Sequence, residues 1–173
     1  MNKTSDNLEE LFDIVNEKDE VIGQAKRGEV HGNPKLIHRS IGVTVTNNKG
    51  EIFLQQRSKT KDTDPLRWTL SCSGHVDSGN SFENAAHREL QEELGIDLDI
   101  KLVTRFIYFG KSETEMVTLF KSKSEGPFKL LKEEIVQGKF YTRNELKSQI
   151  KSGEIKLSKM GRICLEKIGW ILK

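Results

Sequence analysis

The sequence predicts an α/β fold in which a mixed sheet carries packed helices, and the order of its segments supports this class. Short β-rich runs come first, one helical segment follows, further β-rich runs succeed it, and helical stretches close the chain. This order is typical of strands gathered in one sheet with helices laid against it. The length of 173 residues suits a single domain over residues 1–173, with a core large enough to fold alone.

Composition narrows the class of protein. Charged residues make up 31% of the chain and no apolar run approaches membrane length, so the sequence predicts a soluble protein without a membrane partner. The N-terminus lacks the apolar stretch of a signal peptide, and Cys72 and Cys164 form no disulfide framework, which favours a reducing, cytoplasmic setting. A net charge of +2 is too small to indicate nucleic acid as a partner. The oligomeric state is left open.

β-Branched and aromatic runs bounded by Gly, Pro and Asn place the expected elements. The expected strands are a hairpin within 8–25, a second hairpin of 41–46 and 52–56 joined by Asn47-Asn48-Lys49-Gly50, and then 68–73, 100–109, 115–120 and 134–141. Residues 1–35 hold the N-terminal hairpin and a connector punctuated by Gly and Pro. Beyond the central helix, further helices are expected over 143–151 and from Leu157, with Leu157, Met160, Cys164, Ile168 and Ile171 as the packing stripe.

The segment from Gly74 to Ile96 carries the most informative pattern. Glu89, Glu92 and Glu93 stand at i, i+3 and i+4, so on a helix the three carboxylates share one face. Their repulsion, roughly a few tenths of a kcal/mol per pair, would be offset by a divalent cation, and hard oxygen ligands suit Mg²⁺ or Mn²⁺. The alternative interpretation is a solvated acidic face.

Helix signals frame this segment. Asn80 is expected to be the N-cap with Glu83 as its capping partner, and Gly95 supplies the C-terminal stop. An apolar stripe for packing on a sheet consists of Phe82, Ala86, Leu90 and Leu94. Glu93 lies closest to this stripe, so it should be the most sheltered of the three glutamates.

The segment 74–96 resembles the Nudix box, G-x5-E-x7-R-E-U-x-E-E-x-G-U, in which U is aliphatic. The matching residues are Gly74, Arg88, Glu89, Leu90, Glu92, Glu93, Gly95 and Ile96. Asn80 stands where the family has its first Glu, and an amide cannot carry the negative charge of that residue. The resemblance implies the Nudix α/β/α sandwich with a mixed sheet. It also implies that the box glutamates bind divalent metal ions that activate water against a diphosphate linkage.

A second resemblance, over about residues 11–120, is to type I isopentenyl-diphosphate isomerases, themselves a branch of the Nudix family. His31 and His38 have the seven-residue spacing of two histidines of that branch, and His75 ends a run, Trp68 to His75, similar to its W-T-x-S-x-C-G-H stretch. Glu113-Thr114-Glu115 match its E-x-E pair. The resemblance implies a second metal site made by His31, His38, His75, Glu113 and Glu115, a donor set that suits Zn²⁺ or Mn²⁺ better than Mg²⁺.

The same resemblance places the basic contacts of a diphosphate on Arg27, Arg57 and Lys61. One departure concerns the reaction itself, since Ser73 stands at the position of the catalytic Cys of the isomerases. Cys72 is adjacent, and on a strand it points to the opposite face. A hydroxyl is a poor substitute for a thiol that transfers protons, so the sequence favours hydrolysis over isomerisation.

The hypothesis from sequence is therefore a metal-dependent hydrolase that cleaves a diphosphate linkage in a nucleoside diphosphate derivative or another organic diphosphate. Glu93 or Glu115 would take a proton from water, and Glu92 is counted among both the metal ligands and the catalytic residues. Arg88 either contacts substrate or holds a box carboxylate in place. The alternatives are an enzyme like isopentenyl-diphosphate delta-isomerase and a non-catalytic Nudix-fold module that binds a small-molecule diphosphate.

Overall fold

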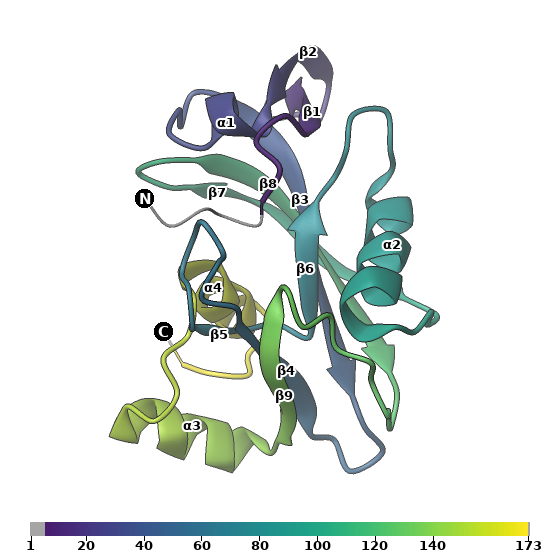
Figure 1. The fold of residues 1–173 in the computed structure, drawn as a ribbon, viewed down its shortest axis with the longest axis vertical. Helices are drawn as coiled ribbons and strands as arrows, with labels where there is room; N and C mark the ends of the chain where they lie inside the picture. Colours follow the sequence, from purple (N-terminus) through teal and green to yellow (C-terminus); the bar gives the residue numbers. More distant parts are fainter. Residues whose placement is uncertain (1–5, 173) are drawn as a thin grey trace.

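A computed structural model describes residues 6–172, and its strands join in one nine-stranded sheet (Figure 1). The strands are β1 (Leu11–Val15), β2 (Val21–Lys26), β3 (Ile37–Thr46), β4 (Ile52–Arg57), β5 (Trp68–Thr69), β6 (Cys72–His75), β7 (Lys101–Phe109), β8 (Thr114–Lys123) and β9 (Ile135–Tyr141). The helices are α1 (Arg27–Val30), α2 (Phe82–Leu94), α3 (Arg143–Ser152) and α4 (Lys159–Lys167). None of the helices in this described range is long and apolar enough to cross a membrane.

Strand β3 lies at the centre of the sheet. It pairs in parallel with β8 along its whole length, from Ile37 opposite Thr114 to Thr46 opposite Lys123. Its other edge pairs antiparallel with β1, β6 and β4 in turn. β4 pairs with β3 at one position only, Ile52 opposite Thr46. Beyond that pair β4 diverges from β3 and forms antiparallel ladders with β5 and β9. The predicted mixed sheet is confirmed.

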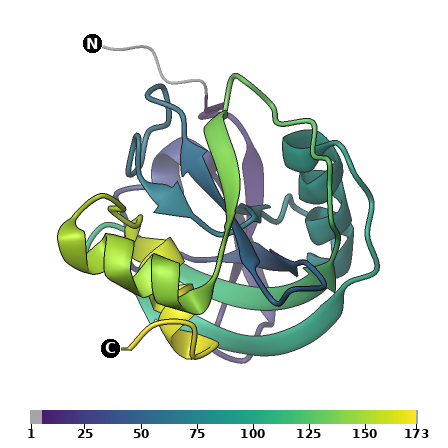
Figure 2. The ribbon, with the colours of Figure 1, turned by 90° about the horizontal axis from the view of Figure 1, so that it is seen from below.

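Helices cover both faces of this sheet, which gives three layers. Helix α2 lies on one face and α3 and α4 lie on the other, as the two views agree (Figures 1 and 2). Residues of β8 alternate between the two cores: Met116 and Phe120 pack with α2, whereas Val117 and Leu119 pack with the C-terminal helices. This is the α/β/α sandwich that the resemblance implied, with apolar residues alternating along a buried strand.

The N-cap of α2 is Ser81, so the prediction of Asn80 is wrong by one residue. The Ser81 hydroxyl accepts a hydrogen bond from the Asn84 amide at 3.1 Å. Asn80 lies in the preceding turn, where its amide donates to the Asp77 carbonyl oxygen at 3.0 Å. Both residue types cap helices well, and the turn that starts at Asp77 decides between them. The expected stop at Gly95 is confirmed, with a left-handed φ of 66°.

The predicted strand 68–73 is divided in two, because its halves pair with different strands. β5 pairs with β4, and β6 pairs with β3. Ser71 lies in the gap between them and is fully buried. Its hydroxyl accepts from the Val45 amide at 2.8 Å and donates to the Phe53 carbonyl oxygen, so it links the diverging β3 and β4.

The chain ends and connector also differ from expectation. The connector contains the one-turn helix α1. Leu157 precedes the last helix and forms a parallel bridge with Trp68, while Ser158 caps α4 by accepting from the Gly161 amide. The helix ends at Lys167. Ile171 of the predicted stripe is buried, but it lies beyond the end of the helix.

Candidate active site

A cleft of about 550 Å³ opens beside β6 and the box helix α2. Its walls come from the N-terminal segment, α1, the loop after β4, α2, the β7–β8 hairpin and the start of α4. The lining includes all the predicted site residues except His38: Arg27, His31, Arg57, Lys61, His75, Arg88, Glu89, Glu92, Glu93, Glu113 and Glu115. The fold therefore gathers residues that are up to 88 positions apart in the chain, counting from Arg27 to Glu115.

The three box glutamates differ in their exposure to solvent. Glu93 is 5% exposed and Glu89 is 8% exposed, whereas Glu92 lies at the exposed rim of the cleft. Glu93 is the most sheltered, as expected from its place beside the apolar stripe. Burial, and then the negative charge of Glu134, raise the pKa of Glu93 to about 7. Burial and the nearby Glu93 raise the pKa of Glu89 well above its ordinary value.

Gly74 makes room for Glu89. A Cβ atom at Gly74 would lie 2.0 Å from the Glu89 carboxylate oxygen Oε1, a distance that no side chain tolerates. The glycine that opens the box therefore lets α2 bring a carboxylate directly against the β6 backbone. Glycine is needed here because of this close approach, and not because of a positive φ angle.

The Glu93 carboxylate is held through one of its two oxygens. The Gln55 side-chain amide donates to Oε2 at 2.8 Å, and the Ser73 backbone amide donates to the same Oε2 at 3.2 Å. Gln55 itself is 2% exposed. Both donors favour the ionised carboxylate and leave Oε1 for another partner.

Arg88 ties the box helix to β6 and the following turn. Its guanidinium lies 3.0 Å from Glu89, 3.2 Å from Glu92 and 3.5 Å from Asp77. It also donates to the His75 carbonyl oxygen at 2.9 Å. Four acceptors occupy this side chain, so it acts on the box carboxylates by holding them in position.

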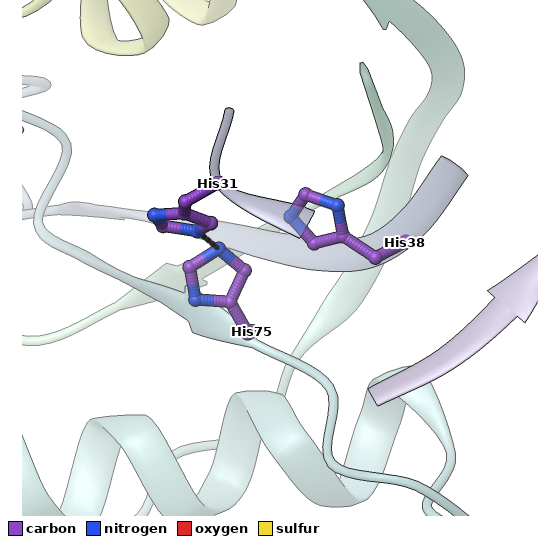
Figure 3. Close-up of side chains that lie close together, drawn as sticks. All are labelled: His31, His38 and His75. Carbon is purple, nitrogen blue, oxygen red and sulfur yellow. Dashed lines mark hydrogen bonds between the residues drawn. The ribbon is translucent and has the colours of Figure 1, made fainter. Parts of the chain in front are cut away.

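Three histidines meet at the N-terminal side of the cleft (Figure 3). One ring nitrogen from each of His31, His38 and His75 lies within 4.8 Å of the others, and the Nε2 atoms of His31 and His75 are 3.4 Å apart. Glu113 Oε2 lies 3.7 Å from His31 Nε2. Glu115 stands opposite His38 in the β3–β8 register and is buried. The structure thus brings the three histidines of the expected second metal site together, with Glu113 beside His31 and Glu115 in the same cleft lining.

Two of the three histidines, His38 and His75, have the protonation state that metal binding needs. Burial lowers the pKa of His38 to about 3 and that of His75 well below its ordinary value, so both rings are neutral at pH 7. His38 is fully buried, and within residues 6–172 neither of its ring nitrogens makes a hydrogen bond of ordinary geometry. This buried, neutral ring lies beside the rings of His31 and His75, an arrangement that is compatible with metal ligation.

Two of the three basic residues expected at the diphosphate, Arg27 and Lys61, are paired with acidic side chains. Arg27 lies 3.2 Å from Glu10 and 3.2 Å from Asp62. Lys61 lies 3.3 Å from Glu134. Arg57 donates to the Thr63 carbonyl and hydroxyl oxygens in the loop after β4.

Ser73 and Cys72 point to opposite sides of β6, as expected for neighbours on a strand. Ser73 lines the cleft. Cys72 is fully buried in the core under α2, and burial followed by the charge of Glu93 raises the pKa of its thiol well above the ordinary value. The Cys72 thiol is therefore part of the packed core and not of the cleft lining.

Several residues of the site were not predicted: Tyr108, Glu134 and Lys159 line the cleft, and the buried Gln55 contacts Glu93. Gln55 belongs to an expected strand, but alternation alone says only which face it occupies. Glu134 and Lys159 come from the C-terminal third of the chain, where no motif with fixed spacing relates them to the box.

Comparisons with known proteins agree with this geometry. The model of the NUDIX domain matches residues 36–160. An uncharacterised Nudix hydrolase of Listeria monocytogenes is 35% identical over 148 residues, which cover 84% of this chain and 87% of the relative. Isopentenyl-diphosphate Delta-isomerase 2 of Photorhabdus laumondii is 40% identical over 101 residues, 58% of this chain. That match spans only 56% of the isomerase.

A crystal structure of a Deinococcus radiodurans protein shares the fold with a TM-score of 0.78 and 26% identity. The superposition covers 89% of this chain and 96% of that protein. The similarity therefore includes the helices on both faces of the sheet as well as the box.

Proposed function

This chain belongs to the Nudix hydrolase family, and from this premise we propose that it is a metal-dependent hydrolase of a diphosphate linkage. Its substrate would be a nucleoside diphosphate derivative or another organic diphosphate. The observation that carries the proposal is the convergence of Glu89, Glu92 and Glu93 on one cleft that also holds basic side chains. Crowded, partly desolvated carboxylates without enough cationic partners favour a bound divalent cation.

Glu89, Glu92 and Glu93 would hold Mg²⁺ or Mn²⁺, and the raised pKa values of Glu89 and Glu93 support this assignment. Gly74 and Gln55 fit the same role, since Gly74 lets Glu89 approach β6 and Gln55 donates to Oε2 of Glu93 and not to Oε1. When bound, such an ion lowers the pKa of water and neutralises charge on the diphosphate. The histidine cluster with Glu113 and Glu115 would hold a second ion, Zn²⁺ or Mn²⁺.

Protein side chains would supply the proton acceptor and the phosphate contacts. Glu93 and Glu115 are the two candidate general bases, because burial raises the pKa of each to about 7, where a base is both ionised and effective near neutral pH. Arg57 at the end of β4 and Lys61 in the following loop would hold phosphate oxygens, together with Arg27, which shares an acidic partner with Lys61. Arg88 positions Glu89 and Glu92.

The test is Mg²⁺-dependent cleavage of the diphosphate linkage, followed through the phosphorylated products, in a panel of nucleotide sugars, dinucleoside polyphosphates, oxidised nucleotides and prenyl diphosphates. The wild type should turn over at least one class, and Glu93→Gln should lower that turnover by about a hundredfold, the scale of a lost general-base or electrostatic contribution. Glu83→Gln is the matched control, because Glu83 is an exposed carboxylate in the first turn of the same helix and does not line the cleft. Unchanged turnover in Glu93→Gln would contradict the assignment.

A second candidate function is isomerisation of isopentenyl diphosphate, which the histidine cluster and the isomerase relatives favour. Ser73 at the thiol position and the buried Cys72 oppose it. Isopentenyl diphosphate in the same panel separates the two functions. We expect no efficient conversion to dimethylallyl diphosphate, and its rapid appearance would establish the isomerase instead. Tight binding of a diphosphate without any turnover would identify a binding module.

A further inference from the structure

An acidic residue of the N-terminal segment occupies the basic side of the cleft. The carboxylate oxygen Oδ1 of Asp6 bridges two cations, lying 3.4 Å from the Arg27 guanidinium and in a short contact with Lys61 Nζ. Its other oxygen, Oδ2, accepts a hydrogen bond from the Asp62 backbone amide at 2.9 Å. The Asp6 side chain is only 4% exposed. One anionic group is thus held by two cations and an amide.

This arrangement is the one that a phosphate group would adopt. Two cations that share one oxygen while a backbone amide binds a second are typical of phosphate sites. Asp6 differs in this respect from the other carboxylates nearby. Of these two cations, Glu10 and Asp62 pair with Arg27, and Glu134 pairs with Lys61. Of the four, only Asp6 joins both cations.

Charge makes simultaneous occupation by Asp6 and substrate unfavourable. Arg27 and Lys61 together carry two positive charges and already face four carboxylates: Asp6, Glu10, Asp62 and Glu134. A diphosphate would bring two or more further negative charges into the same partly buried space. Like charges at contact distance in such an environment repel strongly.

We propose that Asp6 is an affinity-determining residue of this site: its carboxylate takes the place of a substrate phosphate between Arg27 and Lys61 and has to leave when a diphosphate binds. The inference rests on the proposed function, because it takes the substrate to be a diphosphate. A resident carboxylate of this kind disfavours weakly charged ligands, since a ligand must interact with the two cations better than Asp6 does.

The chain anchors the segment just beyond Asp6. The Gly28 amide donates to the Leu8 carbonyl oxygen at 3.0 Å, and the Arg27 amide donates to the Glu10 carbonyl oxygen at 2.8 Å. These backbone hydrogen bonds fix residues 8–10 against α1. Asp6 precedes them, so its carboxylate can leave the cations without breaking any of these anchors.

The experiment compares the wild type with Asp6→Asn and Asp6→Ala, using inorganic pyrophosphate as the probe in calorimetric titrations of the full chain without divalent metal. Glu9→Gln is the matched control. It removes the same charge from the same segment, but Glu9 pairs with the exposed Lys26 and does not line the cleft. Thermal melting of each variant verifies that the fold is intact.

Both Asp6 variants should bind pyrophosphate about tenfold more tightly than the wild type, as expected when a competing charge-assisted contact is removed, and Glu9→Gln should bind as the wild type does. Equal or weaker binding by the Asp6 variants would overturn the inference, because Asp6 would then only hold Arg27 and Lys61 in place. Absence of pyrophosphate binding in every variant would overturn it as well. Tighter binding without turnover of any diphosphate in the panel would refute the proposed hydrolysis and leave the inference standing.

Discussion

Glu93 owes its orientation to a residue that no sequence motif marks. Gln55 reaches it from β4, and both donors to Glu93 use the same oxygen, Oε2. The box glutamates were predictable because their spacing on one helix fixes their common face. Gln55 and Glu134 were not, because a contact between separate strands depends on register and on the twist of the sheet, which spacing does not encode.

Gln55→Leu should weaken Mn²⁺ binding by about tenfold, because groups that orient a metal ligand contribute on that scale. Leucine keeps the volume of this buried position but cannot donate to Oε2, so of these two donors the Glu93 carboxylate keeps only the Ser73 amide. Manganese binding measured by electron paramagnetic resonance at fixed pH gives the answer without an activity assay. Gln91→Leu, an exposed position on α2, is the control. Unaltered affinity in Gln55→Leu would show that α2 alone orients Glu93.

At the scale of elements, the sequence predicts the strands and helices better than their ends. The box helix, both N-terminal hairpins and the strand at 135–141 form where the patterns indicate. The break at Ser71 was missed because both halves of 68–73 are β-rich, and only the divergence of β3 from β4 separates them. The N-cap was missed by one residue because Asn80 and Ser81 are both good caps, and the turn at Asp77 selects between them.

The contact between α2 and β6 leads to a prediction about Gly74. Gly74→Ala should lower the free energy of unfolding by about 1–3 kcal/mol, as expected for overpacking, and should also weaken Mn²⁺ binding, because the added Cβ displaces the Glu89 carboxylate. Gly23→Ala is the control, since a Cβ at Gly23 meets no atom within 4 Å and its φ is not positive. Chemical denaturation and manganese titration measure the two effects. An alanine variant with wild-type stability and affinity would mean that α2 moves away without consequence.

For the whole molecule, the cleft is assembled from segments that the sequence alone cannot join. Periodicity placed His31, His38 and His75 in different elements, and resemblance to the isomerase branch was needed to expect them together. The structure unites them because β3 carries His38 between β6, which carries His75, and β8, which carries Glu115. The same cleft therefore contains many ionisable groups whose charged forms are disfavoured by burial.

These groups make the stability of the metal-free protein depend on pH in two opposite directions. Burial raises the pKa values of Glu93 and Glu115 from 4.5 to about 7, so folding favours their protonated forms and stability falls as pH rises from 4.5 to 7. Burial lowers the pKa of His38 from 6.5 to about 3, so folding favours its neutral form and stability falls as pH drops below 6.5. The metal-free protein should be most stable at mildly acidic pH.

Manganese should reverse the loss on the alkaline side. Metal ligands must be ionised carboxylates and neutral imidazoles, so Mn²⁺ binds the folded state more tightly at pH 8 than at pH 5.5 and stabilises it by linkage. We expect the rise in melting temperature on adding Mn²⁺ to be clearly larger at pH 8, as scanning calorimetry would measure. His31→Ala should diminish that rise and remove about one bound ion per chain, whereas His87→Ala, at a half-exposed ring paired with Asp97, should leave both unchanged. Equal shifts at the two pH values would show that the buried carboxylates do not hold metal, and an unaltered ion count in His31→Ala would remove the histidine site.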